Sequence, residues 1–439
     1  MSQSMKRFRM SAILLCALPL CAQDAGSFFS WPTDVINNEL PSWLRFSGEE
    51  RMRMEGYQNG GFKSNNADYY LLQRLRLNMK IQPAWWLKII AQSQDAREFY
   101  KGGTPAPPYQ DTWDLRLAYA EIGDMEKGFF ALRVGRQDIN LGEERLVGSS
   151  NWTNGARSFD AARLNLHHKK LRLDIFAASV VVERDGGLGE ITPGSNIYGL
   201  YGGLDNVIPN STIEPYLFWR SQSDVKAQLG GVGTYDMKIP GIRWVGTLPL
   251  NFDYNTDLAL ERGSVLKDNI DAWAGHWVVG YNMPAVRFTP RVFAEFNYAT
   301  GSASAKLGER HTFDQLYATA HDKYGFSDQV GWKNIQQIRV GPEFKLTSRW
   351  YLSTRYSDYW LANAHDALYN TSNAVVAQMA NGSAGRWVGQ ELDLVNAIKV
   401  SKITTIGGGL SHIFPGTFLK MATPGHAYTA PYLFFETKF

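Results

Sequence analysis

The amino-acid sequence predicts an all-β fold, a transmembrane antiparallel β-barrel of eighteen strands that follows an N-terminal signal peptide. Three observations support this: a basic and then apolar start, polar and apolar residues that alternate along most of the chain, and an alternating last strand that ends on Phe439. We therefore expect a signal peptide at 1–22, a short periplasmic N-terminal segment at 23–42 and an outer-membrane β-barrel at 43–439.

The first 22 residues have the three parts of a secretory signal peptide. Lys6, Arg7 and Arg9 form a basic start, residues 11–21 form a short apolar run, and the small residue Ala22 precedes a polar stretch. A membrane-spanning helix needs ~20 apolar residues, so this run is too short to be a membrane anchor. We expect the chain to be exported through the inner membrane and cleaved after residue 22.

Removal of the signal peptide changes both the cysteine count and the charge. Cys16 and Cys21 leave with it, so the mature chain forms no disulfide in its oxidising compartment. A lipid anchor at either cysteine is disfavoured because a leucine precedes each. The mature chain keeps 42 basic and 42 acidic residues. Without a net positive charge or a basic run, no nucleic acid partner is expected.

Polar and apolar residues alternate most clearly in the segment 71–81. Leu75 and Leu77 fall on one side of an extended strand, while Arg74 and Arg76 fall on the other. Mean hydropathy is slightly negative, no apolar run is long enough for a transmembrane helix, and aromatic residues make up 13% of the chain. A soluble secreted β-protein and a transmembrane barrel both fit this composition.

The C-terminal strand favours the barrel. In residues 430–439, Leu433, Phe435 and Phe439 share one face, and polar residues are interspersed on the other. A last strand that alternates and stops on a terminal Phe is typical of outer-membrane proteins. The alternative is an edge strand of a soluble sheet, but only a closed barrel pairs every strand edge.

The lengths of the loops set the number of strands. Short links, such as 83–84 and 168–169, alternate with long loops, such as 141–157 and 301–331, and bacterial barrels keep their short turns in the periplasm. Each strand crosses the membrane once, so the number of strands before the loop 301–331 decides on which side it lies. This long loop lies on the extracellular side only if region 196–221 contains two strands. The expected strands lie near 43–57, 69–82, 85–97, 112–122, 128–138, 158–167, 170–183, 196–203, 213–221, 233–246, 251–262, 270–282, 288–300, 334–346, 350–361, 387–399, 402–412 and 428–439. Eighteen is even, as closure with both ends in the periplasm requires, and such a barrel has a water-filled lumen.

Projecting these strands places many charged residues in the lumen. Arginine suits a carboxylate cargo, because its planar fork grips carboxylates bidentately and keeps its charge. Acids on the same wall would loosen that grip and let cargo move on. The alternative is that the arginines pair with the acids and brace the wall. The lumen-facing set comprises Arg74, Arg76, Asp114, Arg116, Arg133, Arg163, Arg172, Asp174, Asp253, Asp257, Glu261, Arg291, Glu295, Arg339, Arg355, Glu391 and Asp393.

The segment 133–137 breaks strict alternation. If the strand alternated without interruption, Arg136 would face lipid while Arg133 faced the lumen. Gly135 between them suggests a β-bulge, which would re-aim the side chain. We therefore expect both arginines inside the barrel.

Several blocks of the sequence are more specific than any strand pattern. The stretch 133–163, VGRQDINLGEERLVGSSNWTNGARSFDAAR from Val134 onward, is followed by blocks at 295–302, 311–335, 359–369, 388–394 and 410–419. Together they resemble the alginate export family of outer-membrane porins over most of the mature chain. The resemblance implies an eighteen-stranded monomeric barrel that passes an anionic polyuronate. It also implies that an electropositive constriction and its supporting loop contain Arg133, Arg136, Arg145, Arg157, Asp160 and Arg163.

These lines of reasoning give one set of candidate substrate-binding residues and one functional expectation. The set is Arg74, Arg76, Arg116, Arg133, Arg136, Arg145, Arg157, Asp160, Arg163, Arg291, Glu295, Arg339 and Arg355. The expected function is a passive outer-membrane channel for an anionic polysaccharide or oligosaccharide, surrounded by outer-membrane lipid and served by a periplasmic export partner. A general or small-anion-selective porin is the alternative.

An enzymatic function is not expected. Neither G-x-S-x-G nor H-E-x-x-H occurs in the chain, and we expect no cofactor and no metal. A barrel hydrolase would need a cluster of His276, His412 and lumen carboxylates. The segment 321–328 carries oxygen donors suited to calcium, but their spacing matches no EF-hand.

Overall fold

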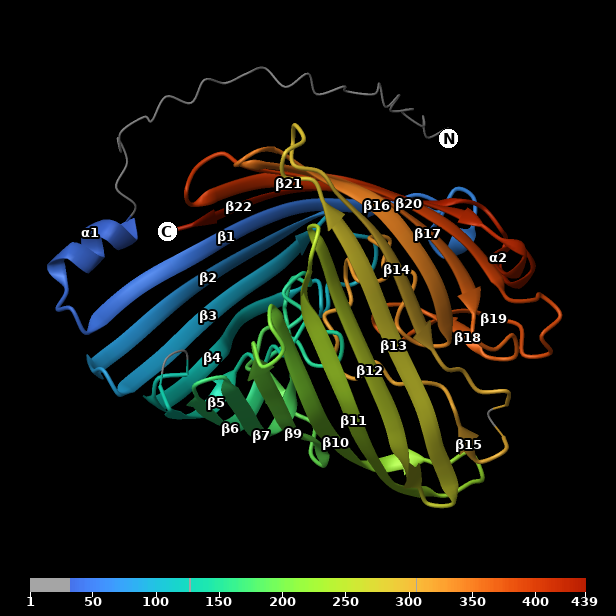
Figure 1. Ribbon diagram of the computed structural model, residues 1–439, viewed down its shortest axis with the longest axis horizontal. Helices are drawn as coiled ribbons and strands as arrows, with labels where there is room; N and C mark the ends of the chain where they lie inside the picture. The colour runs from blue at the N-terminus through green and yellow to red at the C-terminus, as the bar shows by residue number, and fades with distance from the viewer. Residues whose placement is uncertain (1–31, 126–127, 305) are drawn as a thin grey trace, which may run out of the picture.

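The computed structural model describes residues 32–125, 128–304 and 306–439. The predicted signal peptide and residues 23–31 lie outside the described part. The described chain forms a closed antiparallel barrel (Figure 1), in which each wall strand pairs with the next and β22 pairs back onto β1. The eighteen wall strands among the described residues are β1 Leu44–Tyr57, β2 Asp68–Ala84, β3 Leu87–Phe99, β4 Asp111–Gly123, β5 Phe130–Gln137, β6 Phe159–His168, β7 Leu171–Val182, β9 Ser195–Asp205, β10 Ser211–Lys226, β11 Val232–Leu248, β12 Phe252–Val265, β13 Asp268–Asn282, β14 Arg291–Ala299, β16 Ile335–Thr347, β17 Trp350–Leu361, β20 Trp387–Lys399, β21 Thr404–Pro415 and β22 Tyr428–Lys438.

The predicted fold class is confirmed. Every expected strand has a counterpart in the wall, and the division of region 196–221 into β9 and β10 is correct. The largest shift at a strand start is in β14, which begins at Arg291 instead of 288. Phe288 and Thr289 have positive φ angles of 70° and 41°, and such a conformation cannot continue a strand.

Alternation along the wall separates an outer apolar face from an inner polar face. On β1, Met52 and Met54 are 44% and 60% exposed on the outside, while Arg51 and Arg53 are 5% and 2% exposed on the inside. The seam of the barrel is closed by the last residue. The backbone N–H of Gly48 donates to the carbonyl of Phe439 at 2.6 Å, and a Cβ at position 48 would collide with the Phe439 ring.

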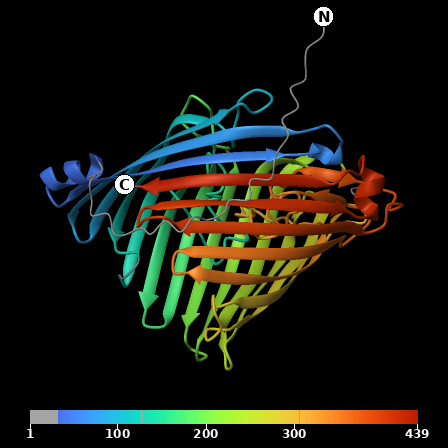
Figure 2. The same cartoon turned by 90° about the horizontal axis from the view of Figure 1, so that it is seen from above.

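A short helix precedes the barrel. Helix α1, Pro32–Glu39, falls in the expected periplasmic segment and lies outside the wall beside the start of β1 (Figures 1 and 2). The Asn37 side chain fixes it there, because it bonds both the carbonyl oxygen and the N–H of Phe46, at 2.7 and 2.8 Å. No helix in the described part of the chain is long and apolar enough to cross a membrane.

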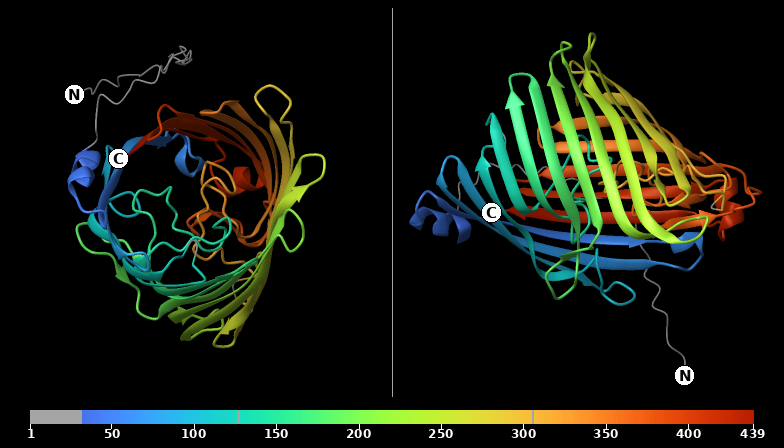
Figure 3. Two further views of the ribbon diagram at one scale, coloured as in Figure 1. Left: turned by 60° about the vertical axis from the view of Figure 1, so that its left-hand side comes forward. Right: turned by 90° about the horizontal axis from the view of Figure 1, so that it is seen from below.

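Two long loops fold into the barrel rather than over its rim (Figure 3). One is the 138–158 loop between β5 and β6, and the other is the 300–334 loop between β14 and β16, which carries the short strand β15, Glu309–Arg310. Their buried apolar side chains, among them Ile139, Phe313 and Trp332, belong to one core cluster with residues of the wall. The hydrophobic core therefore lies inside the barrel, between the loops and the wall.

The remaining elements are small and extend the loop region. They are the 3-10 turn η1 Gly60–Phe62, the strand β8 Glu190–Ile191, the hairpin of β18 Ala367–Tyr369 with β19 Val375–Gln378, and helix α2 Thr417–Ala422. Phe418 and Leu419 of α2 are fully buried in the same core cluster. All of these elements lie at the ends of strands that the loop-length rule places on the extracellular side.

Candidate functional site in the barrel lumen

Four arginines of β1 and β2 hold the tip of the 138–158 loop. Arg51 donates to the carbonyl oxygens of residues 151–153 at 2.9 to 3.1 Å, and Arg74 donates to two of the same carbonyls at 3.0 and 3.2 Å. Arg53 donates to the Trp152 carbonyl, and Arg76 donates to the Asn151 side chain at 2.8 Å. All four are buried and already bonded to the protein, so a cargo in the lumen would not reach them in this arrangement.

Sequence reasoning identified two of these four arginines and missed the other two. Arg74 and Arg76 were expected in the lumen, but Arg51 and Arg53 were not singled out. Arg51 lies directly opposite Arg74 in the β1–β2 ladder. The same alternation along 43–57 would have placed both missed arginines inside.

The two loops inside the barrel are joined into one body. Val147 and Tyr317 form an isolated parallel bridge, in which the Tyr317 N–H donates to the Leu146 carbonyl at 2.9 Å and the Gly148 N–H donates to the Tyr317 carbonyl at 3.0 Å. Arg157 reinforces this bridge by donating to the carbonyls of Gly148 and Tyr317, at 2.9 and 2.6 Å. Arg157, which the resemblance placed in the constriction or its supporting loop, thus joins the two loops to each other.

Trp152 is a second junction between the loops. Its ring stacks on the His321 imidazole, with centroids 3.9 Å apart and planes 4° apart, and the Arg53 guanidinium lies 4.0 Å from its centroid. His321 in turn bonds Asp328 at 2.9 Å. One aromatic ring thus connects β1, the 138–158 loop and the 300–334 loop.

Arg145 and Arg339 attach the loops to the opposite wall. Arg145 contacts Glu143 at 3.1 Å and Glu295 of β14 at 3.5 Å. Arg339 of β16 donates to Glu295 at 2.5 Å and to the backbone carbonyl of Asp322 at 2.8 Å. Glu295 is therefore shared between a loop arginine, Arg145, and a wall arginine, Arg339.

The charge of Arg145 also acts on Glu143. Burial alone would raise the pKa of Glu143, but Arg145 and other nearby cations lower it to about 2.

The other predicted arginines are each paired with a carboxylate. Arg116 binds Asp138, a residue of the loop, at 2.6 Å. The shortest ion-pair distances of the rest are Arg133–Glu121 2.5 Å, Arg163–Asp174 3.0 Å, Arg291–Asp253 2.6 Å and Arg355–Glu343 3.6 Å. Arg133 and Arg163 lie directly opposite one another in the β5–β6 ladder. These pairings match the alternative reading of the sequence, in which lumen arginines brace the wall.

The expected bulge at Gly135 is wrong. The pairing of β5 continues through Gly135 with both neighbouring strands without a register shift, although Gly135 has a φ of 123°. Arg136 therefore lies on the face of β5 opposite to Arg133. Its guanidinium bonds Asp160 at 2.9 Å and lies 3.5 Å from the Leu115 carbonyl oxygen. Arg136 and Asp160 thus form a pair within the wall, and the bulge occurs in β4 instead, where the β3–β4 register shifts.

Partly exposed arginines line the other half of the lumen. The side chains of Arg133, Arg163, Arg172 and Arg291 are between 14% and 34% exposed. They lie on the inner wall in the half where the short periplasmic turns occur.

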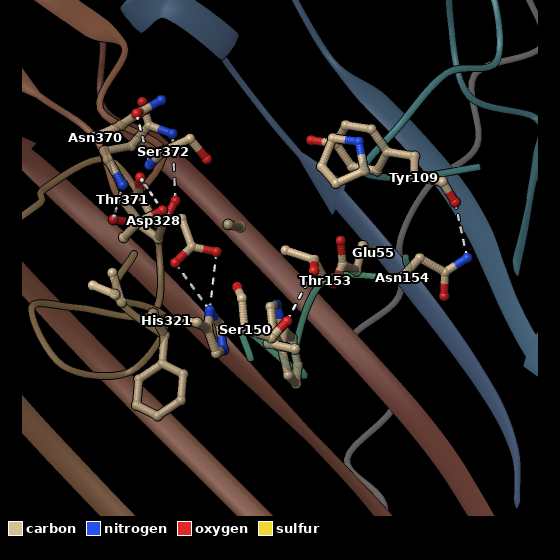
Figure 4. Close-up of a pocket in the computed structure, with 18 of the residues that line it drawn as sticks. Glu55, Tyr109, Ser150, Thr153, Asn154, His321, Asp328, Asn370, Thr371 and Ser372 are labelled. Carbon is tan, nitrogen blue, oxygen red and sulfur yellow. Dashed lines mark hydrogen bonds and ion pairs between the residues drawn. The ribbon is translucent and has the colours of Figure 1, made fainter. Parts of the chain in front are cut away.

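A cavity of about 480 Å³ lies in the extracellular half, between the 300–334 loop on one side and the 138–158 loop on the other (Figure 4). Glu183, just after β7, lies in its lining beside Arg157. The pKa of Glu183 is raised to about 7, mainly by burial and also by the nearby Asp111, while Arg157 opposes the shift. A Cβ on Gly155 would collide with the Glu183 carboxylate, so the loop backbone closes one side of this group.

The raised pKa of Glu183 predicts a pH-dependent stability. The folded protein retains the proton that the unfolded chain loses near its ordinary pKa of 4.5, so Glu183 costs stability as the pH rises from about 4.5 to about 7. Glu183→Gln is expected to be more stable than the native protein at pH 8, by at most about 3 kcal/mol, and equal to it at pH 4.5. Thermal unfolding in detergent followed by circular dichroism measures this.

Glu190→Gln is the matched control, because Glu190 lies in the same loop but is 61% exposed and pairs with Arg184. It should leave the unfolding midpoint unchanged at both pH values. Equal midpoints for Glu183→Gln and the native protein at pH 8 would contradict the assignment.

The histidines do not assemble a hydrolytic centre among the described residues. His276 bonds Asn297 at 2.8 Å and lies 3.4 Å from Glu295, and its other ring nitrogen faces Arg145 rather than a hydroxyl group. His412 bonds the Thr429 hydroxyl at 2.8 Å without a carboxylate partner. In the described ranges there is also no group of three or more side chains arranged to hold a metal ion. His321 and Asp328, considered for calcium, are bonded to each other.

The closed barrel of eighteen strands, with an apolar exterior and a charged lumen, defines an outer-membrane channel. The chain belongs to the alginate export family, whose sequence profile, described as alginate export, matches residues 42–432. This membership and the barrel architecture identify a channel of the outer membrane rather than an enzyme.

Solved structures share the fold at low sequence identity. OccK8 (OprE) from Pseudomonas aeruginosa is 10% identical with a TM-score of 0.60, over 90% of this chain and 98% of that one. OccAB2 from Acinetobacter baumannii is 11% identical with a TM-score of 0.60, over 90% and 98%. OpdO from Pseudomonas aeruginosa is 13% identical with a TM-score of 0.57, over 92% and 99%. No curated protein sequence matched this chain.

Proposed function

We propose that this channel passes an anionic polysaccharide, an alginate-like polyuronate, or related anionic solutes, and that arginines of the lumen provide the selectivity. The observation that carries the proposal is the family match, which extends over almost the whole barrel. Uronate units carry one carboxylate per sugar, and guanidinium groups bind carboxylates bidentately.

The partly exposed arginines of the periplasmic half support this proposal. Arg133, Arg163, Arg172 and Arg291 each hold a carboxylate of the protein at 2.5 to 3.0 Å. A uronate could exchange with such a carboxylate, so each arginine would bind the polymer briefly and release it. Transport requires binding that is strong enough to enter and weak enough to leave.

Passage of a polymer also requires the two loops to move, because they occupy the extracellular half of the lumen. No nucleotide-binding motif occurs in the sequence, so the proposed transport is passive, driven by a gradient or by a periplasmic export partner. We further infer that the chain works as a monomer after removal of residues 1–22.

A small-anion-selective porin is the second candidate. It is favoured by the pairing of the predicted lumen arginines with acids, which leaves little net positive field for a polymer. Such a channel would conduct small anions through the space that the loops leave open. The two candidates differ in whether a polyuronate blocks the current.

Planar-bilayer recordings of the refolded mature chain test the proposal. We expect an anion-biased reversal potential in a KCl gradient and a reversible block by polyuronate added on the periplasmic side. Arg133→Ala should weaken the block about tenfold, which corresponds to about 1.4 kcal/mol and to the loss of one charge-assisted contact.

Arg136→Ala is the matched control, because Arg136 lies on the same strand but bonds Asp160 within the wall. It should leave the block unchanged. Cation selectivity, or a current that polyuronate does not affect, would overturn the polyuronate proposal and favour a general porin.

A further inference from the structure

The cavity in the extracellular half of the lumen has the size and the enclosure of a ligand site. Its volume of about 480 Å³ lies in the range of small-molecule pockets, roughly 300–1,000 Å³. It is lined by β1, β2, β7 and β22 and by five loops, so its walls come from segments far apart in the sequence. Figure 4 shows His321, Asp328 and Asn370–Ser372 on one side and Glu55, Tyr109 and Thr153–Asn154 on the other.

The lining is unusually aromatic for the inside of a polar channel. Tyr57 stacks on Tyr428 with planes 19° apart, and Tyr70 meets Tyr109 edge to face with centroids 5.7 Å apart. Phe326 and Tyr432 stack with planes 20° apart on the other side. Aromatic rings of this kind are rigid, apolar on their faces and polar at the tyrosine hydroxyl. They are suited to the C–H face of a sugar ring.

Amide and hydroxyl groups are placed between the aromatic rings. Asn154 donates to the carbonyls of Gln73, Arg97 and Tyr109, at 2.9 to 3.1 Å, which fixes its orientation. Its Oδ1 is buried without a hydrogen-bond partner among the described residues, and so is Oδ1 of Asn373. Neither oxygen is open to the cavity as the side chains stand, so hydrogen bonds to a ligand would come from the hydroxyl groups of the half-buried Thr371 and the exposed Ser372, which line it.

The carboxylates that line the cavity outnumber its arginines. Glu55 contacts Arg53 at 2.5 Å, Asp328 contacts His321 at 2.9 Å, and Glu183 lies beside Arg157. Each carboxylate therefore faces a base of the protein, and no base is left over for an anionic ligand. A uronate here would face three acids, which is unfavourable in a partly desolvated site.

We propose that this cavity is a second binding site, distinct from the partly exposed arginines of the periplasmic half, and that it accepts an uncharged saccharide of one to three rings through its aromatic and hydroxyl groups. The site lies where a solute on the extracellular side would meet the channel. It does not depend on the polyuronate proposal, since its residues lie apart from Arg133 and Arg163.

Isothermal titration calorimetry of the full mature protein in detergent tests the site with defined probes. The probes are the neutral trisaccharides maltotriose, mannotriose and galactotriose, with trimannuronate as the anionic counterpart. We expect at least one neutral trisaccharide to bind with a dissociation constant of about 1 mM or lower. Tyr109→Ala should weaken this binding at least tenfold, while Tyr109→Phe should retain it because it keeps the ring.

Two further variants keep the test decisive. Ser372→Trp places a bulky ring in the cavity from an exposed loop position, so it should abolish binding even if Tyr109→Ala folds poorly. Tyr119→Ala removes a tyrosine that lies against Arg133 outside the cavity and should leave neutral-sugar binding unchanged.

The outcomes separate this proposal from the polyuronate proposal. If no neutral trisaccharide binds, if binding survives both Tyr109→Ala and Ser372→Trp, or if trimannuronate binds in the cavity more tightly than the neutral probes, the inference is wrong. Loss of polyuronate block in bilayers would overturn only the cargo of the lumen and would leave the cavity result intact.

Discussion

The double variant Arg51→Ala/Arg74→Ala is expected to conduct several times more current per channel than the native protein, with frequent steps between levels. The two guanidinium groups make five hydrogen bonds to the backbone carbonyls of residues 151–153. Hydrogen bonds to charged groups contribute roughly 1.5–3 kcal/mol each. Their removal should loosen the loop tip, which then keeps only the bonds from Arg53 and Arg76 among those of the four arginines, and should widen the lumen. Single-channel recording in planar bilayers measures the change.

Arg45→Ala is the matched control, because Arg45 lies on the same strand but donates only to the nearby carbonyls of Pro41 and Leu44. Its conductance should equal that of the native channel. If the double variant folds, as shown by a heat-modifiable band on electrophoresis, and still conducts like the native channel, the 138–158 loop is not what limits the current.

The barrel wall could be predicted because its signal is local. Alternation and loop length require no knowledge of distant contacts, and the expected strands 350–361 and 387–399 agree with the structure at both ends. Where the expectation shifted, a local backbone feature explains it, as at Phe288 and Thr289. The alternation along β1 also predicts which of its residues face the lumen, although Arg51 and Arg53 were not singled out.

The positions of the loops could not be predicted in the same way. The place of Trp152 depends on contacts with Arg53 and His321, which are distant in sequence and approach it from different segments. Nothing in the composition of the 138–158 loop distinguishes an extracellular flap from a loop that enters the lumen. The prediction that Arg74 binds cargo assumed that no loop lies inside the barrel. In the structure its guanidinium group donates to the backbone of the 138–158 loop.

Arg136 illustrates a further limit. A glycine within a strand fits a bulge, a tight bend or a close approach of two backbones. At Gly135 the third explanation holds, because a Cβ there would collide with the Ala118 carbonyl of β4 while the pairing stays in register. The family resemblance drew attention to this segment, but the face on which Arg136 lies depends on the neighbouring strand.

Because the lumen arginines are paired with acids, the acids affect the electric field in the lumen as much as the arginines do. Glu121 is fully buried and holds both Arg133 and Lys88, at 2.5 and 2.8 Å. Its charge cancels much of the field that these two cations would present to a solute. In the proposed channel, the selectivity of the periplasmic half therefore depends on this carboxylate as much as on Arg133.

Glu121→Gln is expected to shift the reversal potential in a KCl gradient further toward anion selectivity and to tighten polyuronate block about tenfold. The glutamine keeps the size of the side chain, and its amide oxygen can still accept from Arg133 at the position of Oε2. Its NH2 group replaces Oε1, so the hydrogen bond from Lys88 is lost together with one negative charge. A charge at 4 Å contributes about 1 kcal/mol in water and about 4 kcal/mol near a protein surface. A tenfold change, about 1.4 kcal/mol, falls between these limits.

Asp160→Asn provides the control for this prediction, because it makes the same chemical change in a carboxylate that pairs with Arg136 within the wall. It should leave both the reversal potential and the block as they are. The effect of Glu121→Gln should also shrink between 0.1 M and 1 M KCl, since the screening length falls from about 10 Å to about 3 Å. An unchanged reversal potential at 0.1 M would mean that Arg133 and Lys88 do not face the conducting path, whichever anion the channel carries.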